Sequence, residues 1–447
     1  MQITLDELLF AREERARIQK EMQEEHSVPL VSFTMNIPGP EKTNPLIERA
    51  FFIGVSLILE EISADIVARY ENCSKCGPVS IFAVNRDAEK LKQKFTKIEE
   101  THPIGRLFDI DVIDSSGRHV SRDAERGCMI CGSPGRACAA GRLHPVSELL
   151  QKVNEILSDY FLNSDAKRLA ALAKDSLILE VYTYPKPGLV DPESRGAHSD
   201  MDVSVFVSSA EALESYFEEC VIAGVNSRGD SVAPLFPILK KLGIEAEKKM
   251  YEATDGKNTH KGVIFSFGIV LGAIGRLLTP LAQLPSLDEI LSEASKICRP
   301  YVERDFPSAV GATAGERAFI ELGKRGIRGE AADGFPTVKN ISYPTFKAYL
   351  SSGKSKNDAG AFTLIHLIAD VYDTCLYNRG GDGGVVYARG CAKAFLSSET
   401  LSMEKIREMD LNFIKKNLSP GGCADLLSLT YFLYELEAEN FIQKKQV

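Results

Sequence analysis

The chain has 447 residues, of which 44% are hydrophobic and 26% are charged, and its 53 basic and 62 acidic side chains leave a formal net charge of -9. This composition is typical of a globular protein with more than one domain, and the acidic balance argues against nucleic acid as a partner. The N-terminus becomes highly charged within a few residues, and the longest apolar run, 263–275, is too short to cross a bilayer. We therefore expect no export signal, no membrane partner and a cytoplasmic location.

The first third of the chain mixes helical and strand periodicity. Apolar residues at helical spacing predict a charged helix over 5–25 and an apolar helix over 50–68. Strands are predicted at three segments with alternating or β-branched residues: 31–37, 79–84 and 107–114. This part of the chain is typical of an α/β or α+β domain.

From about residue 146 the strand pattern stops, and apolar residues recur at helical spacing. Six later segments repeat this behaviour between glycine-rich polar connectors: 210–223, 262–278, 287–298, 361–376, 403–417 and 423–440. The pattern predicts a larger, mostly α-helical C-terminal domain. We place the boundary between domains 1–160 and 161–447, although no linker composition marks it.

The segment PIGRLFDIDVID places Asp109 and Asp111 two residues apart on a predicted strand. Residues two apart on a strand point to one face, so both carboxylates can bind one Mg²⁺ in a transferase that breaks a phosphoanhydride. Scattered acids on an exposed strand face are the alternative. Basic residues that could meet a triphosphate beside this pair are Arg12, Arg15, Lys42, Arg49 and Arg106, each of which could instead be a solvated charge.

The ten cysteines are interpreted as reduced thiols because no export signal places the chain in an oxidising compartment. The alternative for one group is zinc: Cys128, Cys131, Cys138 and His144 supply enough ligands for a single Zn²⁺. The pair Cys73-x2-Cys76 adds two further thiols.

Acidic residues recur in the helical part. His366, Asp370 and Asp373 fall at i, i+4 and i+7, which predicts one stripe on an apolar helix. Buried carboxylates need a partner such as Mg²⁺ or a cationic side chain. Three further acids stand beside glycines or apolar residues: Asp200, Asp202 and Asp425. Helix acids in ordinary ion pairs remain the alternative for each.

The segment GKNTHKG runs directly into the most apolar stretch of the chain. It does not fit the Walker A pattern, so any phosphate would be bound by a different loop. Lys257, His260 and Lys261 are expected at the N-terminus of a buried helix, where free N–H groups and the helix dipole favour an anion.

Six motifs follow one another in the helical part: LEVYTYPKPGLVD (179–191), GAHSDMD (196–202), NTHKGVIF (258–265), GIRGEAADGFP (326–336), YDTCLYNRGG (372–381) and SPGGCADLL (419–427). Together they resemble triphosphoribosyl-dephospho-coenzyme A synthase over nearly all of 166–447. The chain departs from that family at Tyr372 and Asn378, where aspartate and histidine are usual.

Four motifs in the first third are LLFAREERARIQ (8–19), PLVSFTMNIPGPEK (29–42), PIGRLFDIDVID (103–114) and RGCMICGSPGRACAAGRLH (126–144). They are similar to the transferase that attaches the same prosthetic group to the citrate lyase acyl carrier protein. The resemblance implies a nucleotidyltransferase-like N-terminal domain. A chain with both halves resembles the fused form of the two enzymes.

The resemblance implies two consecutive reactions. The C-terminal domain would use ATP and 3'-dephospho-CoA to make 2'-(5''-triphosphoribosyl)-3'-dephospho-CoA, releasing adenine. The N-terminal domain would then transfer the product to a serine of the carrier protein, releasing pyrophosphate. Whether the carrier belongs to citrate lyase or to malonate decarboxylase stays open.

The implied site residues fall into three groups. Catalytic acids are Asp109, Asp111, Glu180, Asp191, Asp200, Asp202 and Asp373, of which Asp109, Asp111, Asp200, Asp202 and Asp373 would also bind Mg²⁺. Substrate-binding residues of the C-terminal domain are Lys186, Asn258, His260, Lys261, Arg328, Arg379 and Asp425. Those of the N-terminal domain are Arg12, Arg15, Lys42 and Arg106.

Two other interpretations stay open. The helical domain could be a Mg²⁺-dependent hydrolase of ribosyl bonds, because buried aspartates on helices also serve that chemistry. The other is non-catalytic and treats the N-terminal cysteines as a zinc-dependent interaction module on a nucleotide-binding helical domain.

Overall fold

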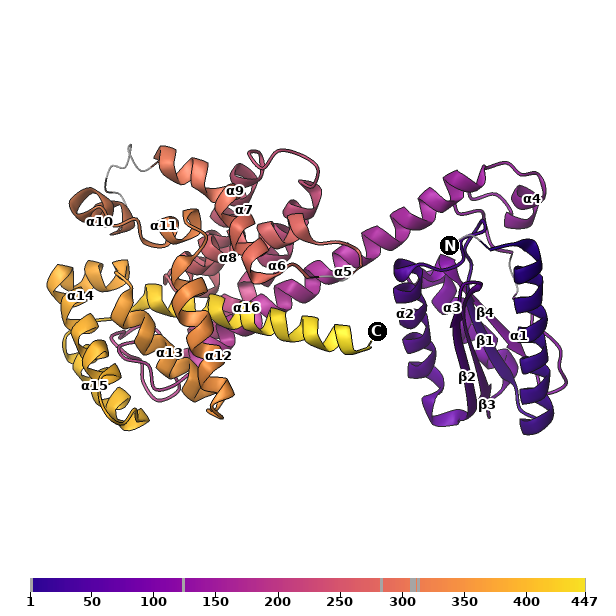
Figure 1. Cartoon of the computed structure of the whole chain (residues 1–447), viewed down its shortest axis with the longest axis horizontal. Helices are drawn as coiled ribbons and strands as arrows, with labels where there is room; N and C mark the ends of the chain where they lie inside the picture. Colours follow the sequence, from indigo (N-terminus) through magenta and orange to yellow (C-terminus); the bar gives the residue numbers. More distant parts are fainter. Residues whose placement is uncertain (1–2, 123–124, 282–283, 306–310, 312–313, 447) are drawn as a thin grey trace. The chain divides into compact units, whose positions relative to one another are not determined.

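The computed structural model describes residues 3–122, 125–281, 284–305, 311 and 314–446 (Figure 1). The chain divides into two units, Met1–Leu162 and Asn163–Val447. The boundary falls inside one continuous helix, α5 (Val146–Tyr182). A helix needs no proline or glycine at such a point, which explains why the composition does not mark it.

The first unit is built on a four-stranded antiparallel sheet with the order β2-β3-β1-β4. Its strands are β1 (Leu30–Met35), β2 (Ile66–Ser74), β3 (Gly77–Val84) and β4 (Phe108–Ile113). The three predicted strands are therefore confirmed as β1, β3 and β4. The prediction was wrong at 63–68, because the apolar helix α2 (Pro45–Ile62) ends earlier and the chain continues into β2. As an edge strand with mostly exposed side chains, β2 carries little apolar signal.

Helices cover both faces of this sheet (Figure 1). The predicted charged helix is α1 (Leu5–His26), and it packs Ile18 and Met22 against one face. On the other face, α2 and α3 (Ala88–Thr101) pack around Phe33 and Phe51, whose rings stack with centroids 4.9 Å apart. Since side chains alternate along a strand, Asp109, Asp111 and Ile113 lie on the α1 side of β4.

Side chains occupy the free edge of β4. The Ile110 N–H donates to Glu99 Oε1 at 2.8 Å, and its carbonyl accepts from Lys92 Nζ at 2.8 Å. The Phe108 carbonyl accepts from Arg126 Nη1 at 2.7 Å. The outward backbone groups of these two residues are thus paired without a fifth strand.

The second unit is helical. After α5 it contains α6 (Val203–Asn226), α7 (Leu235–Ala253), α8 (Lys261–Leu277), α9 (Leu287–Asp305), α10 (Ala314–Leu322), α11 (Gly326–Ala332), a π-helix (Val338–Ser342), α12 (Tyr343–Ser351), α13 (Lys356–Asp370), α14 (Thr374–Leu396), α15 (Met403–Lys415) and α16 (Gly421–Gln446). The mostly helical C-terminal domain is confirmed. Helices α7, α10, α11 and α12 were not predicted.

The buried helix α8 packs closely against α6. A Cβ at Gly224 would lie 2.2 Å from the Gly272 carbonyl oxygen, and one at Gly275 would lie 2.1 Å from that of Val221. The two backbones approach so closely only because no side chain separates them. This contact fixes the C-terminal part of α8 against the C-terminal part of α6.

The predicted helix over 361–376 is wrong in one respect, because it is two helices. Helix α13 ends at Asp370, and α14 begins at Thr374 with Asp373 as its N-cap. Asp373 therefore does not extend the stripe that was predicted with His366. Among the described residues no single helix is long and apolar enough to cross a membrane; α13 and α14 pass that test only as a pair, bent by 55°.

Candidate functional site

The first unit contains two neighbouring cavities, of about 1080 Å³ and about 690 Å³, and Asp109 lines both. Asp111 lines the larger one. In the antiparallel register Asp109 lies opposite Thr34 of β1 and Asp111 opposite Ser32. The predicted pairing of these carboxylates on one strand face is therefore present.

The electrostatics of Asp109 reflect its neighbour. Its side chain is 51% exposed, and Arg126 Nη1 lies 4.0 Å from its carboxylate. Its pKa is raised, first because burial disfavours the charged form and next because Asp111 carries the same charge, while Arg126 acts in the opposite direction. A group with these neighbours is stabilised in its charged form by an added cation.

The predicted cations surround the pair. Arg12, Arg15 and Lys42 line the smaller cavity. Arg106 lines the larger one; its Nη2 donates to the Gly127 carbonyl at 2.7 Å, whereas its Nη1 is buried with no hydrogen-bond partner in the described structure. A buried guanidinium nitrogen without a partner is suited to a phosphate oxygen.

Sequence reasoning missed a buried ion-pair group. Glu99 is 2% exposed and pairs with both Arg122 and Arg126. Only the fold joins them, since α3 and the segment after β4 are separate in sequence. In contrast, Arg49 lines neither cavity and places its guanidinium 4.0 Å from the centre of the Phe161 ring.

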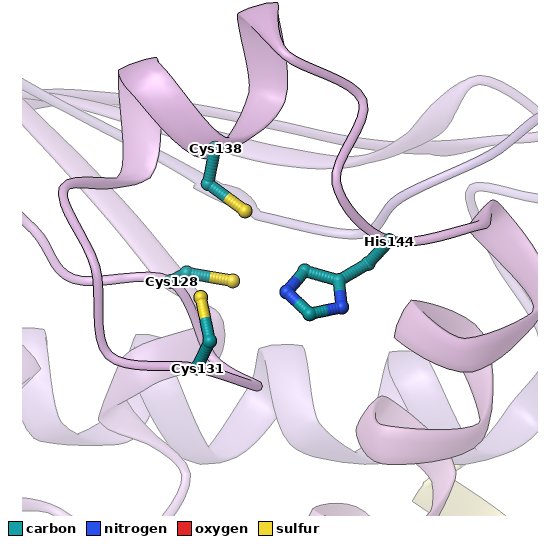
Figure 2. A group of neighbouring side chains, drawn as sticks. All are labelled: Cys128, Cys131, Cys138 and His144. Carbon is teal, nitrogen blue, oxygen red and sulfur yellow. The ribbon is translucent and has the colours of Figure 1, made fainter.

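The three cysteines and the histidine of the zinc alternative come together (Figure 2). One ligand atom from each of Cys128, Cys131, Cys138 and His144 lies within 4.8 Å of the others. The Cys73 and Cys76 pair does not join this group.

The second unit contains a cavity of about 290 Å³ at the N-terminus of α8. Seven of the residues predicted from the sequence line it: Glu180, Lys186, Asn258, His260, Lys261, Arg379 and Asp425. They come from α5, α8, α14, α16 and the connectors before α6 and α8. The fold thus gathers motifs from four separate parts of the chain.

A buried ion pair lines the cavity. Lys186 Nζ donates to Glu180 Oε1 at 2.6 Å, and the two side chains are 1% and 6% exposed. Asp191 lies beneath this segment and accepts from the backbone N–H groups of Lys186, Glu193 and Ser194 at 2.9, 2.8 and 2.8 Å. Asp191 therefore shapes the connector and does not line the cavity.

Two neutral histidines line the cavity. Burial, and next the charge of Lys186, lowers the pKa of His260 to about 3, and its Nδ1 lies 2.7 Å from Ser209 Oγ. Burial, and next Arg379, lowers the pKa of His198 to about 4. Arg379 Nη2 contacts His198 Nδ1 at 3.0 Å.

His198 was missed as a site residue although it stands in a quoted motif. Its Nε2 lies 3.1 Å from the hydroxyl of Ser419, a second residue of the cavity wall that was missed. A histidine beside glycine in a polar connector gives too weak a signal to be assigned a role.

Asp425 is placed differently from the other acids. It has no hydrogen-bond or ion-pair partner within the described part of the chain, and a Cβ at Gly262 would lie 1.9 Å from its Oδ2. Its pKa is raised, first by burial and then by the charges of Asp373 and Glu180. A carboxylate with a raised pKa accepts a proton more readily than a solvated aspartate does.

Three helices begin at this cavity, because Lys261 starts α8, Thr374 starts α14 and Gly421 starts α16, and all three residues line it. Asp373 caps the second helix by accepting from the N–H groups of Cys375 and Leu376 at 2.7 and 3.0 Å. The partial positive charge of these helix ends favours an anion in the cavity.

Besides Asp191 and Asp373, the cavity is not lined by the predicted residues Asp200, Asp202, Lys257 and Arg328. Asp202 is the N-cap of α6 and accepts from the N–H groups of Ser204 and Val205. Arg328 lies on α11, 3.9 Å from Glu316. A capping aspartate resembles a metal ligand in sequence because both stand in polar connectors beside glycine.

Two family models match the chain. Residues 3–160 match apo-citrate lyase phosphoribosyl-dephospho-CoA transferase, and residues 166–442 match ATP:dephospho-CoA triphosphoribosyl transferase. Each match contains its own cavity or cavities.

Relatives match along nearly the whole length. Protein CitXG of Haemophilus influenzae is 31% identical over 96% of this chain and 96% of its own, and Protein CitXG of Leuconostoc mesenteroides is 31% identical over 97% of both. A probable 2-(5''-triphosphoribosyl)-3'-dephosphocoenzyme-A synthase of Vibrio cholerae is 38% identical over 59% of this chain and 87% of its own. The chain therefore belongs to the family of fused transferases that make and attach the citrate lyase prosthetic group.

Proposed function

We propose that the two units catalyse consecutive steps, with the second unit making the triphosphoribosyl nucleotide and the first attaching it to the carrier protein. The observation that carries this proposal is that each matched segment has its own cavity in which acidic side chains lie beside cations. The ribosyl triphosphate would react at its ribose carbon in one step and at a phosphorus in the other. Two separate sites suit these two reactions.

In the second unit, ATP would place its triphosphate at the three helix N-termini. Lys261 and Arg379 add charge there, and Asn258 adds an amide. Lys261 is 47% exposed and pairs with Glu247 at 2.9 Å, so its ammonium is near enough to the rim to exchange that partner for phosphate. This arrangement favours the binding of an anion at the α8 end of the cavity.

The reaction would occur between the buried acids. The bond between ribose C1 of ATP and adenine breaks, and a bond forms from that carbon to the 2'-oxygen of 3'-dephospho-CoA. We assign Asp425 as the base that accepts the proton of the 2'-hydroxyl, because its carboxylate lines the cavity without a partner. The departing adenine takes up one proton, which balances the one that Asp425 removes from the 2'-hydroxyl, and Glu180, held by Lys186, would stabilise positive charge on the ribose.

In the first unit, Asp109 and Asp111 would bind Mg²⁺. The fit rests on two carboxylates on one strand face and on the raised pKa of Asp109, which burial and next the charge of Asp111 produce. The ion would supply charge neutralisation on the departing pyrophosphate. Arg106, with its unpaired Nη1, would hold a phosphate oxygen. The antiparallel sheet carrying an acidic pair supports a nucleotidyltransferase-like fold.

The proposed acceptor is a serine hydroxyl on the acyl carrier protein of citrate lyase. Its oxygen forms a bond to the phosphorus nearest the ribose, and the bond from that phosphorus to pyrophosphate breaks. The product is a phosphodiester, and the hydroxyl proton is lost.

The test uses the full chain, ATP and 3'-dephospho-CoA, with released adenine measured by chromatography. Adenine release that requires 3'-dephospho-CoA supports the proposal, and release from ATP alone would indicate a ribosyl hydrolase instead. Addition of the carrier protein should then increase the carrier mass by the prosthetic group. An unchanged carrier would contradict the assignment of the first unit.

A further inference from the structure

The most specific cluster outside the proposed substrate contacts lies in the segment after β4. Figure 2 shows the sulfur atoms of Cys128, Cys131 and Cys138 and the imidazole of His144 pointing toward a common centre. Ligand atoms of a tetrahedral zinc site lie about 3.8 Å apart when the Zn–S bonds are about 2.3 Å, so atoms within 4.8 Å need only a small contraction.

The backbone around the first two cysteines already has the form of a metal-binding turn. The Cys128 N–H donates to the Ser133 carbonyl at 2.7 Å, and its carbonyl accepts from the Gly132 N–H at 3.0 Å. The Ile130 N–H points at Cys128 Sγ from 3.5 Å. Gly132 has a φ of 72°, which lets the chain turn back at this point. A backbone N–H aimed at sulfur stabilises a thiolate, the form that binds metal.

The other two ligands are held by separate contacts. Cys138 is carried by the short helix α4 (Gly135–Ala140) and is 6% exposed. His144 follows α4, and its Nδ1 lies 3.2 Å from Glu148 Oε2. A carboxylate on one ring nitrogen leaves the other, Nε2, for a metal, as in the carboxylate–histidine–zinc arrangement.

We propose that Cys128, Cys131, Cys138 and His144 bind one Zn²⁺ whose role is to hold the arginine-bearing wall of the first unit's larger cavity. Three thiolates and one imidazole are the ligands that Zn²⁺ prefers, and four protein ligands leave no open position for catalysis. For these three cysteines the proposal takes the zinc alternative over that of reduced thiols without a metal.

The connection to the cavity wall is short. Gly127 precedes the first ligand, and its carbonyl accepts from Arg106. Arg126, one residue earlier, pairs with Glu99 and lies beside Asp109. Zinc would therefore fix the backbone that holds Arg106 and Arg126 in the wall of the cavity that the acidic pair also lines. This role rests on the proposed function of the first unit, whereas the metal site itself does not.

The first experiment measures metal in the reduced full chain. We expect about one zinc per chain, and replacement by Co²⁺ should produce the visible bands of tetrahedral cobalt with a sulfur-to-cobalt band in the near ultraviolet. Reduced protein that takes up neither Zn²⁺ nor Co²⁺ would overturn the proposal.

Variants locate the ligands. Cys131→Ser and His144→Ala should lose the cobalt spectrum, while His144→Cys should keep it with more sulfur character, because four thiolates also bind Zn²⁺. The matched control is the Cys73→Ser/Cys76→Ser double variant, which removes a pair of the same spacing in the same unit and should retain the metal. Metal retained in Cys131→Ser, or lost in the control, would contradict the assignment.

Measuring both activities of the chain distinguishes a specific role of zinc in the first unit from a general loss of folding. Metal-free protein and Cys131→Ser should transfer preformed prosthetic group to the carrier at least about tenfold more slowly. The reason is that the arginine-bearing wall of the cavity would no longer be held in position. Adenine release by the second unit should be unchanged. Full transfer by metal-free protein would overturn the positioning role, whereas absence of transfer by zinc-loaded wild-type protein would instead count against the proposed function.

Discussion

Lys186 and Glu180 form a buried ion pair in the wall of the second unit's cavity, with Nζ 2.6 Å from Oε1. The same ammonium also donates to the Glu180 carbonyl at 2.7 Å. Two ions that leave water together depend on each other, so removing one leaves the other without compensation.

We expect Lys186→Met to lower the free energy of unfolding of the second unit by about 3–5 kcal/mol, because Glu180 would remain buried without a cation. The Glu180→Leu/Lys186→Met double variant should recover part of this loss. Calorimetric unfolding of wild type, Lys186→Met, Glu180→Leu and the double variant measures the coupling. Lys248→Met is the control: its partner Glu245 is at 2.8 Å but both side chains are more than half exposed, so the free energy of unfolding should hardly change. Equal losses in the two single lysine variants would contradict the prediction.

Asp109→Asn and Asp111→Asn should each slow labelling of the carrier protein by about 10²–10³-fold, since each removes a charge that would hold Mg²⁺ against the phosphates. Adenine release should stay at the wild-type rate. Asp114→Asn is the matched control, because this aspartate follows β4 but its Oδ1 accepts from Ser116 and Arg118 in a turn. Loss of both activities in the Asp109 variant would contradict two independent sites.

Asp425→Asn should slow adenine release by about 10²–10⁴-fold through loss of the proposed base. In wild-type protein the rate should fall as the pH is lowered through the raised pKa of Asp425, because the protonated acid cannot accept a second proton. The rate should be measured from pH 5 to 9 with saturating substrates. Asp200→Asn serves as the comparison, since that exposed acid does not line the cavity and should leave the rate unchanged.

Gly262→Ala should disable the second unit although alanine favours a helix. The new Cβ would lie 1.9 Å from Asp425 Oδ2 and push the carboxylate out of position, which we expect to lower adenine release by about 10²-fold. Gly390→Ala in α14 has open space around the Cβ and should be active. Wild-type activity in Gly262→Ala would exclude Asp425 as the base.

His260 should make the second unit less stable as the pH falls. Its pKa is near 6.5 in the unfolded chain and about 3 when folded, so below pH 6.5 the unfolded state binds a proton that the folded state does not. This contribution is present above pH 6.5 and is lost at up to about 1.4 kcal/mol per pH unit down to pH 3.

The comparison is wild type against His260→Asn, which can keep the contact with Ser209. Buried acids with raised pKa values act in the opposite direction, but both proteins contain them, so their contribution cancels in the difference. The stability advantage of wild type should shrink between pH 7 and pH 4. Thermal unfolding of both proteins at each pH measures this difference. A difference that is independent of pH would contradict the lowered pKa.

The parts predictable from sequence depend on short-range periodicity. The two carboxylates of Asp109 and Asp111 share a face because side chains alternate along any strand. The start of α8 at Lys261 was visible because polar residues change abruptly to apolar ones there.

The parts that could not be predicted depend on contacts between distant segments. Asp373 keeps helical spacing with His366, and only the structure reveals that it caps a new helix and also accepts from the Cys423 N–H at 2.8 Å. The pairing of Glu99 with Arg122 likewise follows from the packing of α3 beside β4. No local sequence pattern predicts such contacts between distant residues.

The occupied edge of β4 limits how a partner polypeptide can approach the acidic pair. Lys92, Glu99 and Arg126 already use the outward N–H and C=O groups that strand addition would need. β-augmentation at this side of the sheet is therefore blocked at Phe108 and Ile110. Under the proposed function, a carrier protein that approached from this side would be recognised at these two positions through side chains rather than by main-chain pairing.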